Sequence, residues 1–302
     1  MGVIYSTEAV SRGHLPKPGA HSEAASELLA ALFGADQHPS LLAGMIYGSV
    51  ALGNENLRSD IDVFVLYDAA AAVEALATVS RCVREVSGQH HTVFEVHASP
   101  HHRNYAQIDD YAIDDMIGSH LRSIAEHNNR WVRGDIASYL ASPPMGSEAI
   151  IAGARHAIAH KSFKFAKALC SEFDLASLQR AYEFPSTVGR RALDIISLVD
   201  NSYRVDRGWR SHLQAATRSY LADTIGDTAL VESHDALVSG NNRYTTLLER
   251  AIAGDVSENE YDSELRGHYV PAMNNALNLA NGWQYIINRL VAREFSYSAK
   301  DA

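Results

Sequence analysis

Two aspartates separated by one residue stand at the start of an apolar run, in Ser59-Asp60-Ile61-Asp62-Val63. In an extended strand, residues two apart point to the same side, so Asp60 and Asp62 present adjacent carboxylates on one face. Like charges this close raise each other's pKa unless a cation neutralises them. Mg²⁺ prefers oxygen ligands and commonly accompanies nucleotide phosphates, so it suits such a pair. The pattern predicts that Asp60 and Asp62 are catalytic metal ligands.

A Gly48-Ser49 turn follows the short apolar run Met45-Ile46-Tyr47 and precedes the aspartates. Glycine permits close backbone approach, and free N–H groups with a serine hydroxyl suit the outer phosphates of a nucleoside triphosphate. Metal ions held between the aspartates and these phosphates would favour in-line displacement, with pyrophosphate as the leaving group. The sequence therefore predicts nucleotide binding at Gly48 and Ser49. Arg58, just before Ser59, either contacts a phosphate or only decorates the turn.

Together these residues resemble the signature of the polymerase-β-like nucleotidyltransferase superfamily. That signature reads Gly-Ser, a glycine four positions after the serine, and then Ser-Asp-x-Asp before an apolar strand. The positions in register here are Gly48, Ser49, Gly53, Ser59, Asp60 and Asp62. The resemblance covers roughly residues 40 to 100. It implies transfer of a nucleoside monophosphate from a triphosphate, taken as ATP, to a hydroxyl, with Mg²⁺ as cofactor and Ser59 in the nucleotide site.

A third carboxylate on a later strand is also part of what the resemblance implies. Glu95 matches it, because its setting Val93-Phe94-Glu95-Val96 is similar to that in the aminoglycoside adenylyltransferases. There the third acidic residue serves as a metal ligand or as the general base toward the acceptor hydroxyl. Both roles stay open for Glu95, and a surface glutamate on a half-exposed strand is the alternative.

The elements that must position these residues follow from hydrophobic periodicity. Apolar residues at helical spacing predict helices over residues 21–33, 69–86 and 108–128. Short runs of β-branched and aromatic residues predict strands over 45–47, 61–67 and 91–97, with an edge strand beginning at Trp131-Val132. The first half is therefore expected to be an α+β nucleotidyltransferase core, a small mixed sheet with flanking helices.

The second half has a different character, because helical patterns follow one another without a convincing strand. Ser142-Pro143-Pro144-Met145-Gly146 interrupts both periodicities and marks the boundary. We expect a nucleotidyltransferase domain over 1–142 and an all-α helical domain over 143–302. The expected helices of the second domain cover 148–172, 187–203, 212–225, 243–253 and 271–294.

Two groups of charged or titratable residues can be interpreted either as parts of a functional site or as ordinary surface residues. Lys161, Lys164 and Lys167 are three of only five lysines and share one predicted helix. A solvated helical face is the commoner explanation, and contact of Lys161 or Lys164 with the triphosphate is the functional one. The second group comprises His90, His91, His97, His101 and His102. No second His or Cys group completes a tetrahedral site, so only His97, which shares a strand face with Glu95, is expected near the acceptor.

The composition of the chain restricts which partners it can bind and in which cellular compartment we expect it. The formal net charge of −10 over 302 residues disfavours a long nucleic acid, whose affinity comes largely from Lys and Arg. A small cationic acceptor bearing hydroxyls, such as an aminoglycoside-like antibiotic, suits that field better. No stretch reaches the length of a membrane span, and Cys82 and Cys170 are too few for a disulfide framework. We therefore expect a cytoplasmic enzyme without a membrane partner.

Rival functions remain at this point. Relatives of the superfamily also nucleotidylate proteins or transfer RNA, in toxin–antitoxin or regulatory roles, and a basic groove would favour that alternative. A non-catalytic nucleotide-binding regulator is a further possibility, although intact Asp60 and Asp62 argue against it. An Arg followed five to seven residues later by His would indicate a ribonuclease-like or toxin-like module in the helical half. Four arginines satisfy this spacing, as chance predicts in a chain with 15 histidines.

Overall fold

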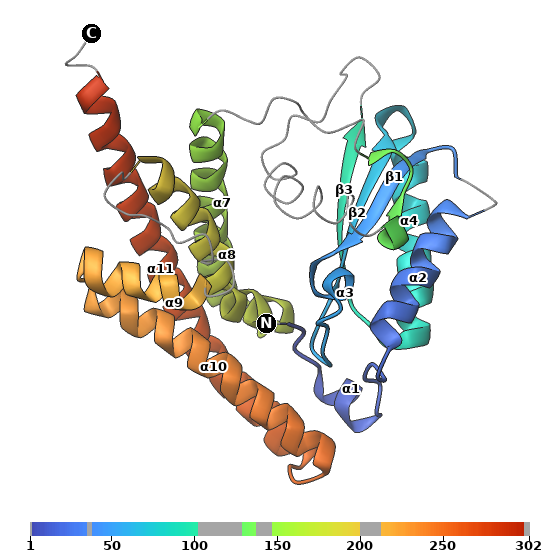
Figure 1. The fold of residues 1–302 in the computed structure, drawn as a ribbon. Coiled ribbons are helices and arrows are strands. Elements are labelled where there is room, and N and C mark those ends of the chain that lie inside the picture. Colours follow the sequence, from blue (N-terminus) through green and yellow to red (C-terminus); the bar gives the residue numbers. More distant parts are fainter. Residues whose placement is uncertain (1, 35–37, 102–128, 137–146, 200–212, 299–302) are drawn as a thin grey trace. The chain divides into compact units, whose positions relative to one another are not determined.

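The computed structural model describes residues 2–34, 38–101, 129–136, 147–199 and 213–298. It is an α+β protein with a small mixed sheet and many helices (Figure 1). Contacts between residues divide the chain into two compact units. The sheet unit comprises Gly2 and Gly13–Gly146, and the helical unit comprises Val3–Arg12 together with Ser147–Ala302. The predicted helix at 108–128 and the predicted boundary at 142–146 lie outside the described residues.

The sheet has the strand order β3-β2-β1-β4. Strand β1 (Leu41–Tyr47) runs antiparallel to β2 (Ile61–Asp68) and to β4 (Val132–Arg133), whereas β3 (Phe94–His101) runs parallel to β2. Parallel neighbours need a crossover, and helix α4 (Ala72–His90), preceded by the 3₁₀ turn Ala69–Ala71, supplies it. The expected small mixed sheet is confirmed, and β4 forms its edge after the 3₁₀ turn Asn129–Trp131.

Helices α2 (Ala20–Phe33) and α4 pack against each other and against the strands, and Figure 1 shows both on one face of the sheet. The inward stripe of α2 includes Leu28 and Leu32, which are fully buried. In β2, Val63 and Val65 are equally buried. Burying such a side chain contributes about 1.5–3 kcal/mol each, so the strand that carries Asp62 is firmly anchored in the core.

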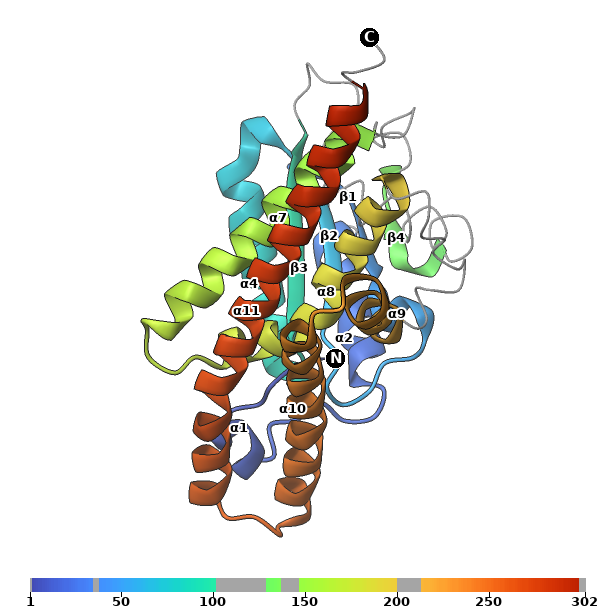
Figure 2. The same cartoon turned by 90° about the vertical axis from the view of Figure 1, so that its left-hand side faces the viewer.

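The helical unit contains α7 (Ser147–Leu169), α8 (Leu175–Val199), α9 (Leu213–Ser219), the π-helix Tyr220–Ile225, α10 (Thr228–Ala253) and α11 (Glu258–Ser298). Helices α10 and α11 lie side by side in both views (Figure 2). Large aromatic side chains fill the core, and Tyr220 stacks on Trp283 with ring centroids 6.0 Å apart. Among the described helices, none has both the length and the apolar composition needed to cross a membrane.

The amino-terminal segment packs within the helical unit and includes the short helix α1 (Thr7–Ser11), which Ser6 caps. Just before it, the Tyr5 N–H donates to the Tyr244 hydroxyl at 2.7 Å. The Tyr261 hydroxyl in turn donates to the Tyr5 carbonyl at 3.0 Å. Both bonds are buried, where a hydrogen bond lost on one side leaves a costly unpaired group.

Several expected boundaries were wrong, because capping and packing override local proline signals. Helix α11 was expected to begin at Pro271 but begins at Glu258, where the Ser257 hydroxyl accepts the Glu260 N–H. Helix α10 begins at Thr228 instead of residue 243, since the Asp227 side chain accepts the Leu230 N–H. Helix α8 likewise begins before residue 187 and contains a proline at residue 185.

The third strand also begins later than the expected residue 91. His91 adopts φ 54, a left-handed conformation that ends α4, so the chain is still in a turn at this point. Strand β3 then begins at Phe94 and continues to His101. The later start leaves Glu95 near the beginning of the strand.

Candidate metal centre

Three carboxylates meet at one end of the paired strands β2 and β3. Asp60 lies one residue before β2, Asp62 is the second residue of β2, and Glu95 is the second residue of β3. The parallel register places Asp62 opposite Glu95. Each of the three carboxylates offers one oxygen, and these oxygens all lie within 4.8 Å of one another. The sequence predicted Asp60 and Asp62 side by side on one strand and Glu95 on a later strand, and the pairing of β2 with β3 brings Glu95 to the two aspartates.

The cluster is electrostatically unfavourable by itself. Burial raises the pKa of Asp60 above its ordinary value, and the charge of Glu95 raises it further. Glu95 is more open to solvent, with 55% of its side chain exposed. A set of carboxylate oxygens at this spacing fits a hard divalent cation such as Mg²⁺, which would offset the mutual repulsion. The residues present therefore fit the metal that the sequence predicted.

Gly48 leaves room for the Asp62 carboxylate beside the turn that follows β1. Its φ of +68° lies in the left-handed region, which glycine adopts without steric cost. A Cβ atom at this position would lie 1.8 Å from the Asp62 Oδ2 atom, a distance no side chain tolerates. Tyr47, the preceding residue, is the register partner of Asp62. The glycine is thus required both by the backbone turn and by the carboxylate beside it.

The predicted phosphate-binding turn forms the short helix α3 (Gly48–Leu52). Gly53 ends it with φ 69°, and the Asn54 N–H donates to the Ser49 carbonyl at 3.1 Å. Ser49 follows directly on Gly48 and is half-buried. The turn is therefore a defined structure next to Asp62, although its predicted contact with phosphates stays a prediction.

Arg58 and Ser59 are both buried in the loop that leads to Asp60. The Arg58 guanidinium donates to the Gly2 carbonyl at 3.1 Å. The Ser59 hydroxyl accepts the Asn56 N–H at 2.9 Å, and the Ser59 carbonyl lies 2.9 Å from Nε2 of the buried His21. These contacts show a structural task for both residues, namely fixing the loop before Asp60. Their predicted part in nucleotide binding stays a prediction.

Lys161 and Lys164 lie on α7, so they belong to the helical unit and not to the unit that carries the acidic cluster. Lys164 is exposed and Lys161 is half-buried. Phe165, next to Lys164 in sequence, is buried and packs edge-on against Phe184 at 5.1 Å. The two lysines thus lie on a helix that also packs buried residues such as Phe165 into the core. Their predicted contact with the triphosphate stays a prediction.

The described histidines of the predicted cluster have separate partners. His90 pairs with Glu27 at 2.8 Å, and His91 stacks on His14 with centroids 4.6 Å apart. His102 lies outside the described residues. In the described part of the chain, these histidines do not form a metal-ligand group.

His97 lies beside the acidic cluster, as its shared strand face with Glu95 predicted. Its Nε2 atom is 3.5 Å from Glu95 Oε1, and its ring centroid is 6.2 Å from that of Tyr47. Sequence reasoning missed Tyr47, which it assigned only to an apolar strand. It also missed His21 as a support of the Ser59 loop. Tyr47 had a usable signal, because it directly precedes the predicted phosphate-binding glycine.

Comparison of the chain with models of known protein families gave no match, and a search of curated proteins gave none either. The acidic cluster and its geometry are therefore the basis for a functional proposal.

Proposed function

We propose that the sheet unit is a Mg²⁺-dependent nucleotidyltransferase centre that transfers a nucleoside monophosphate, from ATP, to a hydroxyl of a small-molecule acceptor. The observation that carries this proposal is the gathering of one oxygen each from Asp60, Asp62 and Glu95 within 4.8 Å of one another, next to Gly48, where a Cβ would collide with the Asp62 carboxylate. An acidic surface patch alone is common. It is less common for such a patch to include a half-buried aspartate of raised pKa, Asp60, and a turn whose glycine makes room for a second aspartate, Asp62.

In this proposal each residue of the centre has a distinct task. Asp60 and Asp62 hold the cation, which supplies charge stabilisation at the phosphates when bound. Gly48 leaves room for Asp62, and the Ser49 hydroxyl and the backbone of the turn face the outer phosphates. Glu95 either completes the ligand set or accepts the proton of the acceptor hydroxyl.

The bond changes in the proposed reaction balance without a further reactant. The acceptor oxygen forms a bond to the α-phosphorus of the triphosphate, and the bond from that phosphorus to the bridging α–β oxygen breaks. Pyrophosphate leaves with the bond's electron pair. The hydroxyl proton passes to a base, which is Glu95 if it is not committed to the cation.

The acceptor class follows from charge. With a formal net charge of −10, the chain attracts small cations and repels long polyanions. An amine-bearing polyol, such as an aminoglycoside-like antibiotic, combines positive charge with several hydroxyls. We propose it over a protein or transfer RNA acceptor, because the net charge disfavours a large polyanion and the candidate centre is itself built from three carboxylates.

The direct test incubates the full chain with Mg²⁺ and each nucleoside triphosphate beside a panel of hydroxylated antibiotics. Pyrophosphate release and the mass of the acceptor are followed together. We expect release with one triphosphate, and an acceptor heavier by one nucleoside monophosphate. Asp62→Asn should lower the rate by about 10³-fold or more, because it removes a ligand charge with little change of shape.

Asp68→Asn is the matched control, since it makes the same change at the other end of β2, where the side chain accepts the Ala70 N–H. It should stay within about twofold of the wild-type rate. Equal activity of Asp62→Asn and wild type would refute the proposal. Nucleotide binding without pyrophosphate release for any acceptor, protein and transfer RNA included, would favour a non-catalytic regulator.

A further inference from the structure

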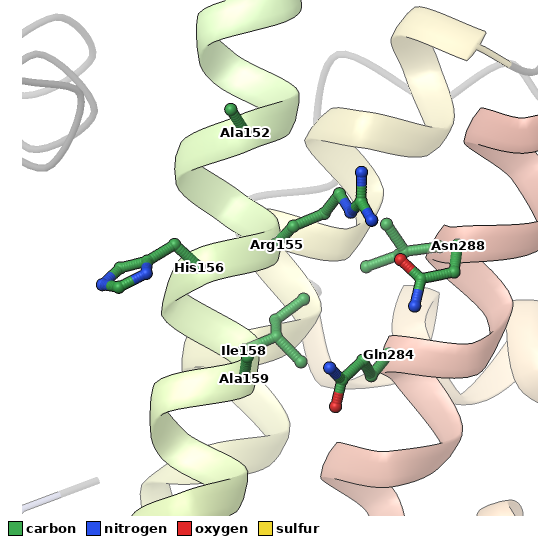
Figure 3. A pocket seen from close by; sticks show the side chains of 8 residues that line it. Ala152, Arg155, His156, Ile158, Ala159, Gln284 and Asn288 are labelled. Atoms are coloured by element: carbon green, nitrogen blue, oxygen red, sulfur yellow. The ribbon is translucent and has the colours of Figure 1, made fainter. Parts of the chain in front are cut away.

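A hollow of about 350 Å³ lies between helices α7 and α11 of the helical unit (Figure 3). This volume is at the lower end of the range for small-molecule sites. Residues from one face of α7 and one face of α11 line it, at helical spacing along both helices. They are Ala152, Arg155, His156, Ile158, Ala159, Gln284, Ile287 and Asn288.

The hollow results from small side chains where two helices pack in opposite directions. The Ser162 hydroxyl donates to the Asn281 side chain at 2.6 Å, which fixes the pairing of α7 with α11 one turn away. Ala152 and Ala159 leave space that a larger residue would fill. Below them, Ile158 and Ile287 are almost completely buried and form an apolar floor. The hollow thus has apolar walls that water solvates poorly.

Polar groups from both helices converge over this floor. Figure 3 shows the Arg155 guanidinium reaching toward α11 on the side of Asn288, the Gln284 amide pointing toward α7 near Ala159, and His156 pointing away. No acidic residue lines the hollow, and among the described residues no carboxylate pairs with Arg155. This is unusual for a chain in which 36 acidic residues outnumber 26 basic ones. Toward the described residues, the five donors of the Arg155 guanidinium are therefore available to a ligand.

We propose that this hollow binds a small organic acid, one carboxylate on an apolar body. The carboxylate lies on the Arg155 guanidinium, whose planar fork matches it with two parallel hydrogen bonds. The apolar body fills the space beside Ala152 and Ala159, the lining residues with exposed apolar surface. The amides of Gln284 and Asn288 donate to or accept from polar substituents at the rim.

The composition of the hollow favours a carboxylate over a phosphate. A phosphate carries more charge and more acceptor oxygens than one guanidinium and two amides satisfy. Backbone N–H groups are no help, because the lining residues lie inside helices, where these groups bond to the preceding turn. The net charge of −10 further weakens binding of a multiply charged anion. The inference does not depend on the function proposed for the sheet unit.

The test measures binding of four probes to the full chain by calorimetry and by ligand-observed NMR. The carboxylates are phenylacetate and hexanoate, phenylacetamide is the neutral analogue of the first, and inorganic phosphate is the compact polyanion. We expect both carboxylates to bind, and phenylacetamide to bind about tenfold or more weakly, since it lacks the charge. Arg155→Gln should weaken phenylacetate by a similar factor.

Two further variants separate this site from general charge effects. Arg81→Gln removes the same charge from an exposed position on α4 and should leave phenylacetate binding unchanged. Ala159→Leu fills the hollow and should weaken both carboxylates while the thermal unfolding temperature is kept. The proposal is overturned if phosphate binds as well as phenylacetate, if Arg155→Gln and Ala159→Leu bind phenylacetate like wild type, or if no carboxylate binds at about 10 mM.

Discussion

The acidic cluster of the sheet unit and the hollow of the helical unit present opposite charges, and they differ in how far water solvates the charged groups. In the sheet unit, Asp60 is half-buried and close to two other carboxylates, so its ionisation is disfavoured. In the helical unit, Arg155 is exposed, and its charge costs little because water solvates it.

This difference indicates where the fold tolerates an unfavourable arrangement. Packing alone gives no reason to hold Asp60, Asp62 and Glu95 together, since polar neutral residues would fit without repulsion. The helical unit has no comparable cluster among its described residues. Destabilising charge that is kept in place is typical of functional sites, and the predictions below measure whether the cluster behaves in this way.

After Asp62→Asn, the largest effect is expected for Glu95→Gln. If Glu95 is the base, the chemical step should slow by about 10²- to 10⁴-fold with metal and triphosphate binding nearly unchanged. If it is a ligand, metal affinity should fall as well. In chelator, the unfolding temperature should rise, because the charge that opposes Asp60 ionisation is gone. Single-turnover kinetics, metal titration and thermal unfolding measure the three quantities.

Glu85→Gln is the control for this variant, since Glu85 is an exposed residue of α4 paired with Arg81. It should change neither activity nor metal affinity. A drop in stability of Glu95→Gln in chelator would contradict the view that the cluster is destabilising.

Gly48→Ala is expected to have the next largest effect, and Gly53→Ala is its matched partner. Both glycines have φ near +70°, so an alanine costs about 1–2 kcal/mol of unfolding free energy at either position. Only at Gly48 does the new Cβ meet the Asp62 carboxylate; at Gly53 it meets nothing within 4 Å. Displacing Asp62 should reduce activity by about 10²-fold in Gly48→Ala. Equal activity of the two variants in a pyrophosphate assay would contradict this account.

Ser49→Ala probes the turn itself, where a smaller effect is expected. Affinity for the triphosphate should fall about tenfold, as for a lost hydrogen bond to a charged group. Affinity for the monophosphate should stay within about twofold, because that ligand lacks the outer phosphates. Calorimetry with both ligands measures the difference. Equal losses of affinity for the triphosphate and the monophosphate would contradict a contact between Ser49 and the outer phosphates.

The smallest effect is expected for His234, a buried residue of the helical unit. Burial lowers its pKa below the ordinary 6.5, while the hydrogen bond and charge of Asp235 oppose this shift. Below about pH 6.5 the unfolded chain takes up a proton that folded His234 resists, so stability falls on acidification. Above this pH the residue is neutral in both states and has no effect. His234→Leu should therefore lose less stability than wild type between about pH 7.5 and 5.5 in thermal unfolding. An identical pH dependence in the two proteins would show that His234 does not contribute.

The sequence was informative where residues close in the chain are also close in space. Gly48, Asp60 and Asp62 lie within fifteen positions, on two antiparallel neighbours whose register follows from the hydrophobic pattern. Glu95 required one further inference, the parallel pairing of β3 with β2, which the structure shows. The mixed sheet and the helix α2 were predictable for the same reason, because their periodicity is local.

The rest depended on contacts between distant residues. Arg155 and Gln284 are separated by most of the helical unit, and no local pattern indicates that α7 meets α11 at this point. The starts of α10 and α11 depend on the caps Asp227 and Ser257, which were not recognised in a polar stretch. The collision that Gly48 avoids is likewise visible only once Asp62 is placed beside it.

The hydrogen bonds of Tyr5 make the sheet unit an insertion. Residues 3–12 belong to the helical unit, where Tyr5 bonds to Tyr244 and Tyr261, so the chain passes into the sheet unit at residue 13 and returns to the helical unit at residue 147. The helical unit is discontinuous in sequence, and a fragment that begins at residue 147 would leave both tyrosine hydroxyls without Tyr5. A separable helical protein would need residues 3–12 supplied as a peptide or joined by a new linker, whereas a single continuous gene segment can encode all of the sheet unit except Gly2.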